Sequence, residues 1–344
     1  MRKLIVALVL FLAVAFVILR ISEVKTIVDT LHHSNYRFLI AAVVVEGIWF
    51  YNSATNYAVL YRLMGLKEKT THLILVATAA NFINVIAPTA GIGGMAVFMD
   101  DARRRNHPSG RVTVVGVLYV LFDYVAFFCV LALGFIVLVR RNNLNIGEIT
   151  AAAILLAIAV GMAFLLYLGY RSAERLGRAL AWMARLVNRI LFPFIKREYI
   201  QQERAYEFAR EAAVGIDLLR GKRKEFLWPF LFALNNFALL ICVLAFTFLA
   251  LGTPFTVGTL VGAFAISYLF LIVSPTPSGV GVVEGVMTIA LNSLRVQMGA
   301  AALITLTYRF ITFWLPLAVG GIAFRALGNK KAQFPTEKQP EDPA

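Results

Sequence analysis

The chain has 344 residues, of which 60% are hydrophobic and only 15% are charged, and its mean hydropathy is +0.77. A water-soluble globule of this length could not bury so much apolar surface, and the same composition excludes a disordered chain. The two cysteines, Cys129 and Cys242, lie inside long apolar runs, which argues against a secreted disulfide scaffold. The remaining class is an all-α polytopic membrane protein.

The formal net charge of +14 does not indicate nucleic-acid binding, because the basic residues gather at the edges of apolar runs, as the positive-inside rule predicts. At the N-terminus, Arg2 and Lys3 precede the apolar run 4–19, which has the form of a signal peptide. No small-x-small cleavage site follows this run. We therefore expect an uncleaved first helix with a cytoplasmic N-terminus.

Apolar runs of two kinds follow each other along the chain. About six are continuous and predict full spans: 4–19, 38–61, 112–139, 150–170, 226–250 and 300–324. Two others, 72–99 and 257–294, are interrupted by polar residues, prolines and glycines. The interrupting residues are Asn81, Asn84, Pro88, Gly91, Gly93 and Gly94 in the first, and Pro275, Pro277, Gly279 and Gly281 in the second. Such backbone cannot face lipid, so it must be buried in protein or line a wet cavity.

The two interruptions resemble each other, because each contains Pro-Thr followed by a Gly-(Ile or Val)-Gly sequence. If both segments are re-entrant hairpins, 26 of the 33 basic residues lie on the inner side, six lie outside, and Arg309 lies within a span. In an alternative topology the first interrupted segment crosses the membrane once, the second crosses it twice, and the N-terminus lies outside. This arrangement places 24 basic residues on the inner side and 8 on the outer side. We prefer the hairpins because they keep Arg2 and Lys3 inside and account for the prolines.

In the preferred topology the unit of span, broken hairpin and span occurs twice with opposite orientation. Inverted repeats with broken helices are a common plan of transporters, whose substrate sites lie at the breaks. The alternative is that the prolines and glycines only kink packed helices.

The largest polar stretch, 171–225, carries 13 basic and seven acidic residues with helical spacing of its apolar positions. We expect a cytoplasmic insert of two amphipathic helices that lie on the inner membrane surface. The alternative is a solvated linker. The preceding and following parts form one transmembrane domain, 1–327, and the polar tail 328–344 is expected to be a disordered cytoplasmic segment.

Four ionisable residues lie in or at the ends of apolar runs: Glu46, Asp123, Glu284 and Arg309. Each would cost roughly 2.5 to 3.5 kcal/mol at the bilayer centre, so each must face protein or water. We expect an ion pair between Glu284 and Arg309, which has either a functional or a purely structural role. Glu46 is nearer the end of its span and is interpreted as interfacial or snorkelling.

The sequence contains none of the common catalytic motifs that we considered. The four histidines have no metal-ligand spacing, and the chain contains neither a phosphate-binding GxxxxGK[ST] loop nor a GxSxG nucleophile elbow. We therefore expect transport rather than catalysis, with no metal and no cofactor, and without ATP-driven pumping by this chain alone.

These residues resemble the lysylphosphatidylglycerol synthase transmembrane-region family, also called the flippase-like domain family. The resemblance covers roughly 4–327, and its more specific half is the Pro-x-Pro, Gly-x-Gly and glutamate pattern of Pro275 to Glu284, followed by Arg309. The family implies a lipid-translocating domain, best known fused to a soluble aminoacyl-transferase. Because the sequence ends soon after the last predicted span, we expect no such transferase domain here, and residues 89–95 lack the Arg and Glu that many members carry after the first proline.

The first hypothesis is a flippase-like protein of a prokaryotic inner membrane, with both termini cytoplasmic, that moves an anionic phospholipid or polyprenyl-linked lipid between leaflets. The alternatives are a secondary transporter of a small anion, and an accessory protein for a separate lipid- or glycan-modifying transferase. The expected partners are anionic lipid head groups, and free backbone N–H groups at half-helix starts would hold a phosphate. The expected substrate-binding residues are Asn84, Pro88, Gly91, Gly93, Gly94, Asp123, Pro275, Pro277, Gly279, Gly281, Glu284 and Arg309.

Overall fold

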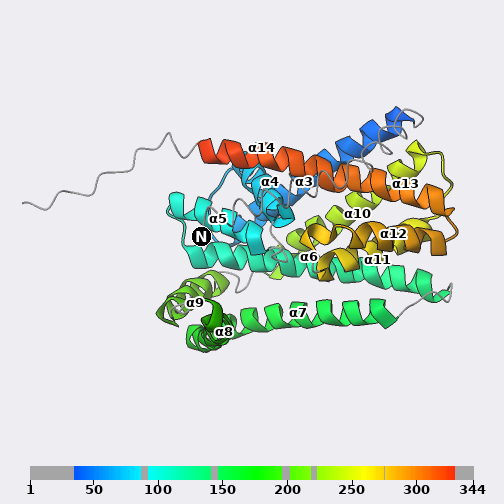
Figure 1. Cartoon of the computed structure of the whole chain (residues 1–344). Coiled ribbons are helices and arrows are strands. Elements are labelled where there is room, and N and C mark those ends of the chain that lie inside the picture. Colours follow the sequence, from blue (N-terminus) through cyan, green and yellow to red (C-terminus); the bar gives the residue numbers. More distant parts are fainter. Residues whose placement is uncertain are drawn as a thin grey trace, which may run out of the picture.

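The structure is a computed structural model that describes residues 35–86, 92–140, 146–195, 202–217, 223–274 and 276–329. Within these ranges the chain is all-α and no strand occurs (Figure 1). The predicted first span 4–19 and the tail from 330 lie outside the described residues. Pro88, Gly91 and Pro275 also lie outside them. The predicted class, an all-α membrane protein, is confirmed.

Five helical stretches are long and apolar enough to cross a membrane, and each matches a run predicted from the sequence. They are α3 (Tyr36–Leu63), α6 (Ser109–Arg140), α7 (Ile146–Arg171), the stretch from η1 (Arg223–Phe226) through α10 (Leu227–Ala250), and the stretch from α13 (Met298–Arg309) through η3 (Phe310–Trp314) into α14 (Leu315–Asn329). The long helices lie side by side in Figure 1. Five of the six continuous apolar runs therefore form the expected long helices, and the sixth, 4–19, lies outside the described residues.

Each interrupted segment forms two shorter helices that pack against each other. The first consists of α4 (Thr70–Ile86) and α5 (Ile92–Arg104). The second consists of α11 (Val257–Val273), a short 3-10 turn η2 (Pro277–Gly279) and α12 (Val282–Ser293). Each segment thus turns back on itself as a hairpin. The inverted repeat stays a prediction.

Close approach of the helices depends on small and polar residues, as is common where no hydrophobic effect drives helices together. A side chain added at Gly134 of α6 would meet the β-carbon of Ala265 on α11 at 2.5 Å. Between α3 and α10, Asn52 donates hydrogen bonds to Asn236 Oδ1 (2.6 Å) and to the backbone oxygen of Phe232 (2.8 Å). These contacts position the helices that surround the second hairpin.

Two helices occupy the polar insert, α8 (Ala173–Ile195) and α9 (Gln202–Asp217). They pack on each other, and α9 also packs on α6, where the backbone N–H of Gly110 donates to Glu211 Oε2 (2.7 Å). In Figure 1 both helices lie at the end of the bundle that also holds α5. The insert is therefore docked on the bundle through α9. Its contact with a membrane surface stays a prediction.

The last long stretch is interrupted by the π-helical turn η3, which separates α13 from α14. Pro316 explains the turn, because proline has no N–H to donate and its ring clashes with the carbonyl four residues earlier, which here belongs to Thr312. The hydroxyl of Thr312 in turn donates to the backbone oxygen of Tyr308 (2.9 Å). The wide turn begins directly after Arg309, the charged residue predicted to lie in a span.

Candidate functional site: a cavity between the two broken hairpins

Arg309 is buried, with 4% of its surface exposed, and its guanidinium is held on three sides. Its Nε donates to Glu284 Oε1 (2.9 Å), and its Nη2 donates to the backbone oxygen of Ser278 (3.0 Å). Its central carbon lies 4.6 Å from the ring centroid of Phe313, a cation–π contact. The predicted ion pair between Glu284 and Arg309 is confirmed.

Glu284 joins this pair to the broken backbone of the second hairpin. Its other carboxylate oxygen, Oε2, accepts the backbone N–H of Gly281 (2.6 Å) and so satisfies a free donor at the start of α12. Gly279 and Gly281 both have positive φ angles, and Ser278 between the halves has φ 48°. The strained turn is thus fixed by one carboxylate and one guanidinium.

The first hairpin is closed in a similar way by a polar side chain. The Oδ1 atom of Asn84, near the end of α4, accepts the backbone N–H of Gly94 in the first turn of α5 (2.5 Å). A side chain added at Gly94 would meet Asn84 Nδ2 at 2.6 Å, so a larger residue there would displace the Asn84 side chain from this position. Gly93 precedes it in the same turn. Asn84 therefore holds the two halves of the hairpin together.

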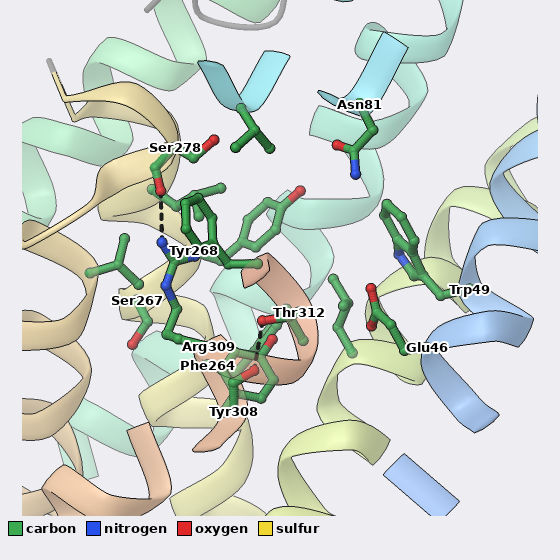
Figure 2. Close-up of a pocket in the computed structure, with 15 residues that line it drawn as sticks. Glu46, Trp49, Asn81, Phe264, Ser267, Tyr268, Ser278, Tyr308, Arg309 and Thr312 are labelled. Atoms are coloured by element: carbon green, nitrogen blue, oxygen red, sulfur yellow. Dashed lines mark hydrogen bonds between the residues drawn. The ribbon is translucent and has the colours of Figure 1, made fainter. Parts of the chain in front are cut away.

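A cavity of about 170 Å³ lies where the two hairpins meet, with room for several water molecules. Both hairpins contribute to its wall, since Asn81 and Val85 come from α4 and Ser278 comes from η2, and α4 and η2 are in contact. Figure 2 shows Asn81 and Ser278 on the same rim of the cavity. Its lining residues are Glu46, Trp49, Asn81, Val85, Leu240, Phe264, Ser267, Tyr268, Leu271, Ser278, Val283, Tyr308, Arg309, Thr312 and Phe313.

Among the described residues that were predicted to bind a substrate, only Arg309 lines this cavity directly. Glu284 and the turn of Pro277, Gly279 and Gly281 lie behind the wall, where they position Arg309 and Ser278. Asn84, Gly93 and Gly94 lie at the first break, next to Val85 of the wall. The other predicted residues (Pro88, Gly91 and Pro275) lie outside the described ranges.

Asp123 lies outside the cavity wall but is connected to it through one side chain. Tyr268 of α11 lines the cavity, and its hydroxyl is hydrogen-bonded to the Asp123 carboxylate on α6. Tyr119 continues the polar contacts on the same helix, since its hydroxyl donates to Ser53 Oγ on α3 (3.4 Å). Asp123 therefore belongs to a polar network behind the cavity.

Glu46 was missed as a cavity residue, and its interpretation as interfacial or snorkelling is wrong. It is 2% exposed and lines the cavity from α3, with Trp49 one turn further along. Figure 2 shows Glu46 and Trp49 on one side of the cavity and Arg309 and Ser278 on the other. The sequence did hold a signal, because Glu46, Ser53 and Asn56 share one face of the helix at spacings of seven and three.

Two buried polar atoms on this side of the cavity have no hydrogen-bond partner among the described residues. Within the described ranges no hydrogen-bonding group reaches Glu46 Oε2 or Trp49 Nε1, although both atoms are buried. Buried polar atoms are normally hydrogen-bonded, so such atoms in a cavity indicate a place for a proton, water or ligand. In the part of the chain that the structure describes, no group of three or more histidine, cysteine or acidic side chains is arranged so that it could hold a metal ion.

The family model of the lysylphosphatidylglycerol synthase TM region matches residues 4–320 of the chain. The chain belongs to this family. It is also similar to a UPF0104 membrane protein of Methanothermobacter thermautotrophicus, with 22% identity over 312 residues, covering 89% of this chain and 90% of that protein.

Membership of the lysylphosphatidylglycerol synthase TM-region family agrees with the long apolar helices, and the chain is a multi-pass membrane protein. The match spans both hairpins and the Glu284–Arg309 pair, so the cavity lies inside the part of the chain that defines the family.

Proposed function

We propose that this protein moves an anionic phospholipid or polyprenyl-linked lipid between the leaflets of a prokaryotic inner membrane, without nucleotide hydrolysis. The observation that carries the proposal is the cavity between two broken hairpins with a buried guanidinium in its wall. Broken helices that meet at a polar cavity are the usual substrate sites of transporters. The family to which the chain belongs is named for a lipid synthase, which supports a lipid substrate.

The proposed path separates the two parts of the lipid. The phosphate of the head group passes through the cavity beside Arg309 and Ser267, while the acyl or prenyl tails remain in the bilayer. Apolar side chains are exposed along α7, with Ile154, Leu156 and Phe164 among them, and such a surface suits contact with lipid. The basic insert, which includes α8 and α9, would gather anionic lipids at about 1 kcal/mol per basic residue near the surface.

The proposed orientation follows the charge distribution. Both termini and the insert 171–225 face the cytoplasm, and the hairpins enter as inverted repeats from opposite sides. The transmembrane domain spans 1–327, and a tail from 328 follows it. A separate transferase that makes or consumes the lipid is the expected protein partner.

A transfer assay on proteoliposomes tests this function. Fluorescent phosphatidylglycerol and phosphatidylcholine are placed in both leaflets, and dithionite then quenches only the label that reaches the outside. We expect the wild-type protein to raise the quenched fraction of the anionic lipid above that of empty liposomes. Equal quenching with and without protein, for both lipids and for a labelled polyprenyl phosphate, would remove the lipid-transfer proposal and leave the accessory role.

Variants of the buried arginine sharpen the assay. Arg309→Gln should slow the anionic lipid more than the zwitterionic one, because it removes the positive charge that the described residues of the cavity wall offer to a phosphate. Arg309→Lys keeps the charge and should retain part of the selectivity. Arg140→Gln removes an exposed arginine at the end of α6 and serves as the matched control. Equal slowing of both lipids by Arg309→Gln would contradict a role in recognising the head group.

A small soluble anion is the second candidate substrate, and the volume of the cavity favours it. About 170 Å³ accommodates a phosphate ion or a phosphate group but not a whole phospholipid. Uptake of radiolabelled inorganic phosphate into the same proteoliposomes distinguishes the two. Uptake of phosphate without transfer of any labelled lipid would establish the small-anion transporter in place of the flippase.

A further inference from the structure

We propose that Glu46 binds a proton while an anionic head group occupies the cavity, so that the protein carries one proton together with each lipid. The inference rests on the proposed function and extends it to the coupling ion. It starts from the position of Glu46 on α3, across the cavity from Arg309 (Figure 2).

The surroundings of Glu46 do not compensate a negative charge. The residue is 2% exposed, and within the described parts of the chain its Oε2 has no hydrogen-bond partner. The buried arginine of the cavity is already paired with Glu284 at 2.9 Å and is in contact with the ring of Phe313. An uncompensated buried carboxylate is costly and tends to take up a proton.

The ionisable groups that face Glu46 come from several helices. Tyr308 and Arg309 come from α13, and Tyr268 comes from α11 with Asp123 of α6 behind it. The residues that α10 and α4 place in the cavity wall, such as Leu240 and Asn81, carry no charge. The tyrosines are neutral at ordinary pH.

The charges of the cavity give the proton a specific role. Arg309 and Glu284 cancel, so an ionised Glu46 leaves the cavity with one net negative charge. A phosphate of the head group would add a second negative charge in a poorly screened space, where like charges repel strongly. A proton on Glu46 removes the repulsion between the carboxylate and the phosphate, so that the attraction between the phosphate and the Arg309 guanidinium is no longer opposed.

The transport cycle balances in atoms and charge. On one side of the membrane the carboxylate takes a proton from water, and the phosphodiester anion enters beside Arg309. On the other side the lipid leaves and the carboxylic acid returns the proton to water. One proton and one monoanionic head group cross together, so the step is electrically neutral, and a pH gradient can drive the lipid toward the alkaline side.

Proteoliposomes with labelled phosphatidylglycerol and the pH dye pyranine inside test this coupling. With the lumen alkaline by one pH unit, a one-to-one coupling would favour the inner leaflet by up to about tenfold, because each pH unit is a tenfold ratio of proton activity. We expect wild-type protein to accumulate the anionic label in the inner leaflet and to acidify the lumen, with no such effect for phosphatidylcholine.

Variants of the carboxyl separate coupling from transfer. Glu46→Gln imitates the protonated acid and cannot exchange a proton, so whatever transfer of the anionic lipid it retains should occur without accumulation and without proton flux. Glu46→Asp should retain both in part. Glu225→Gln removes an exposed carboxyl at the start of the α10 stretch and serves as the matched control. If Glu46→Gln fails to fold, the wild-type protein alone still tests the coupling: proton flux should accompany transfer of the anionic lipid and should be absent with the zwitterionic lipid.

The outcomes separate the inference from the function on which it rests. Absence of any lipid transfer by wild-type protein at equal pH would overturn the proposed function itself. Transfer that moves no protons, or that follows a sodium gradient at equal pH, would overturn only the role of Glu46. Accumulation by Glu46→Gln equal to that of wild type would do the same.

Discussion

Arg309 Nε and Glu284 Oε1 lie 2.9 Å apart, although the two residues are on different helices and 25 positions apart in the sequence. The second oxygen of the same carboxylate accepts the N–H of Gly281 at the start of α12. One side chain therefore neutralises the buried guanidinium and completes the hydrogen bonds of the broken backbone. Because Glu284 has both roles, replacing one member of the pair and replacing both should change the stability of the protein by different amounts.

Removal of the arginine alone should destabilise the protein strongly. Arg309→Met leaves the Glu284 carboxylate, whose side chain is 16% exposed, without its positive partner; loss of one partner of a fully buried pair typically costs about 3 to 5 kcal/mol, which is an upper bound here. Combining it with Glu284→Gln should restore part of the loss, since glutamine is neutral and its side-chain oxygen can still accept the N–H of Gly281. Unfolding in mixed micelles gives the free energies. A double variant as unstable as the sum of the two single ones would show that the residues are not coupled.

The closure of the first hairpin by Asn84 should also contribute measurably. Asn84→Ala leaves the N–H of Gly94 without its acceptor, which should cost about 1 to 3 kcal/mol of stability. Gly94→Ala should have a similar effect, because the new side chain would meet Asn84 at 2.6 Å. Gly285→Ala in α12, where nothing lies within 4 Å, is the control. Thermal unfolding in detergent should show that Asn84→Ala and Gly94→Ala are both less stable than Gly285→Ala. An Asn84→Ala protein as stable as the Gly285→Ala control would contradict the role of Asn84 in closing the hairpin.

Docking of the insert on the bundle should depend on Gly110. A side chain there would overlap Glu211 and approach the backbone nitrogen of Ala212 at 2.7 Å, so Gly110→Ala should push α9 away from α6. We expect faster hydrogen exchange in α9 with little change in α13. Gly161→Ala, which meets nothing within 4 Å, is the matched control. Unchanged exchange in α9 of the Gly110→Ala protein would show that the contact does not hold the insert.

The orientation in the membrane can be tested with single cysteines. In a background with Cys129→Ala and Cys242→Ala, a cysteine at the exposed position Glu207 of α9 should react only after the cells are opened. A cysteine at the exposed position Val257, at the start of α11, should react with an impermeant maleimide from outside. The reverse labelling pattern would overturn the proposed topology.

Local composition was sufficient to predict the fold and the ion pair. Continuous apolar runs can only become helices in a bilayer, and two opposite charges at similar depth have a strong reason to meet, as Glu284 and Arg309 do. The prolines and glycines likewise located the two breaks. Local reasoning therefore found the elements that build the second hairpin and its buried arginine.

The cavity itself was harder to predict, because its wall depends on which helix faces which. Glu46 lies near the end of its apolar run, and depth along one helix does not show that the residue faces a neighbour. Asp123 was placed in the site by its mid-span position, yet Tyr268 separates it from the cavity. Both differences come from rotation of a helix about its own axis, which the apolar runs of α3 and α6 specify weakly.

The π-helical turn after Arg309 has a consequence for the rotational phase of the last helix. One additional residue in a turn rotates everything that follows by about 100° relative to a regular helix with 3.6 residues per turn. This rotation brings Gly320 against α4, where an added side chain would meet Phe82 at 2.8 Å and the backbone oxygen of Thr78 at 3.0 Å. If the π-helical turn moved by one position along the chain, the rotation of α13 relative to α14 would change. The orientation of the Arg309 guanidinium in the cavity and the contact of α14 with the first hairpin are therefore coupled.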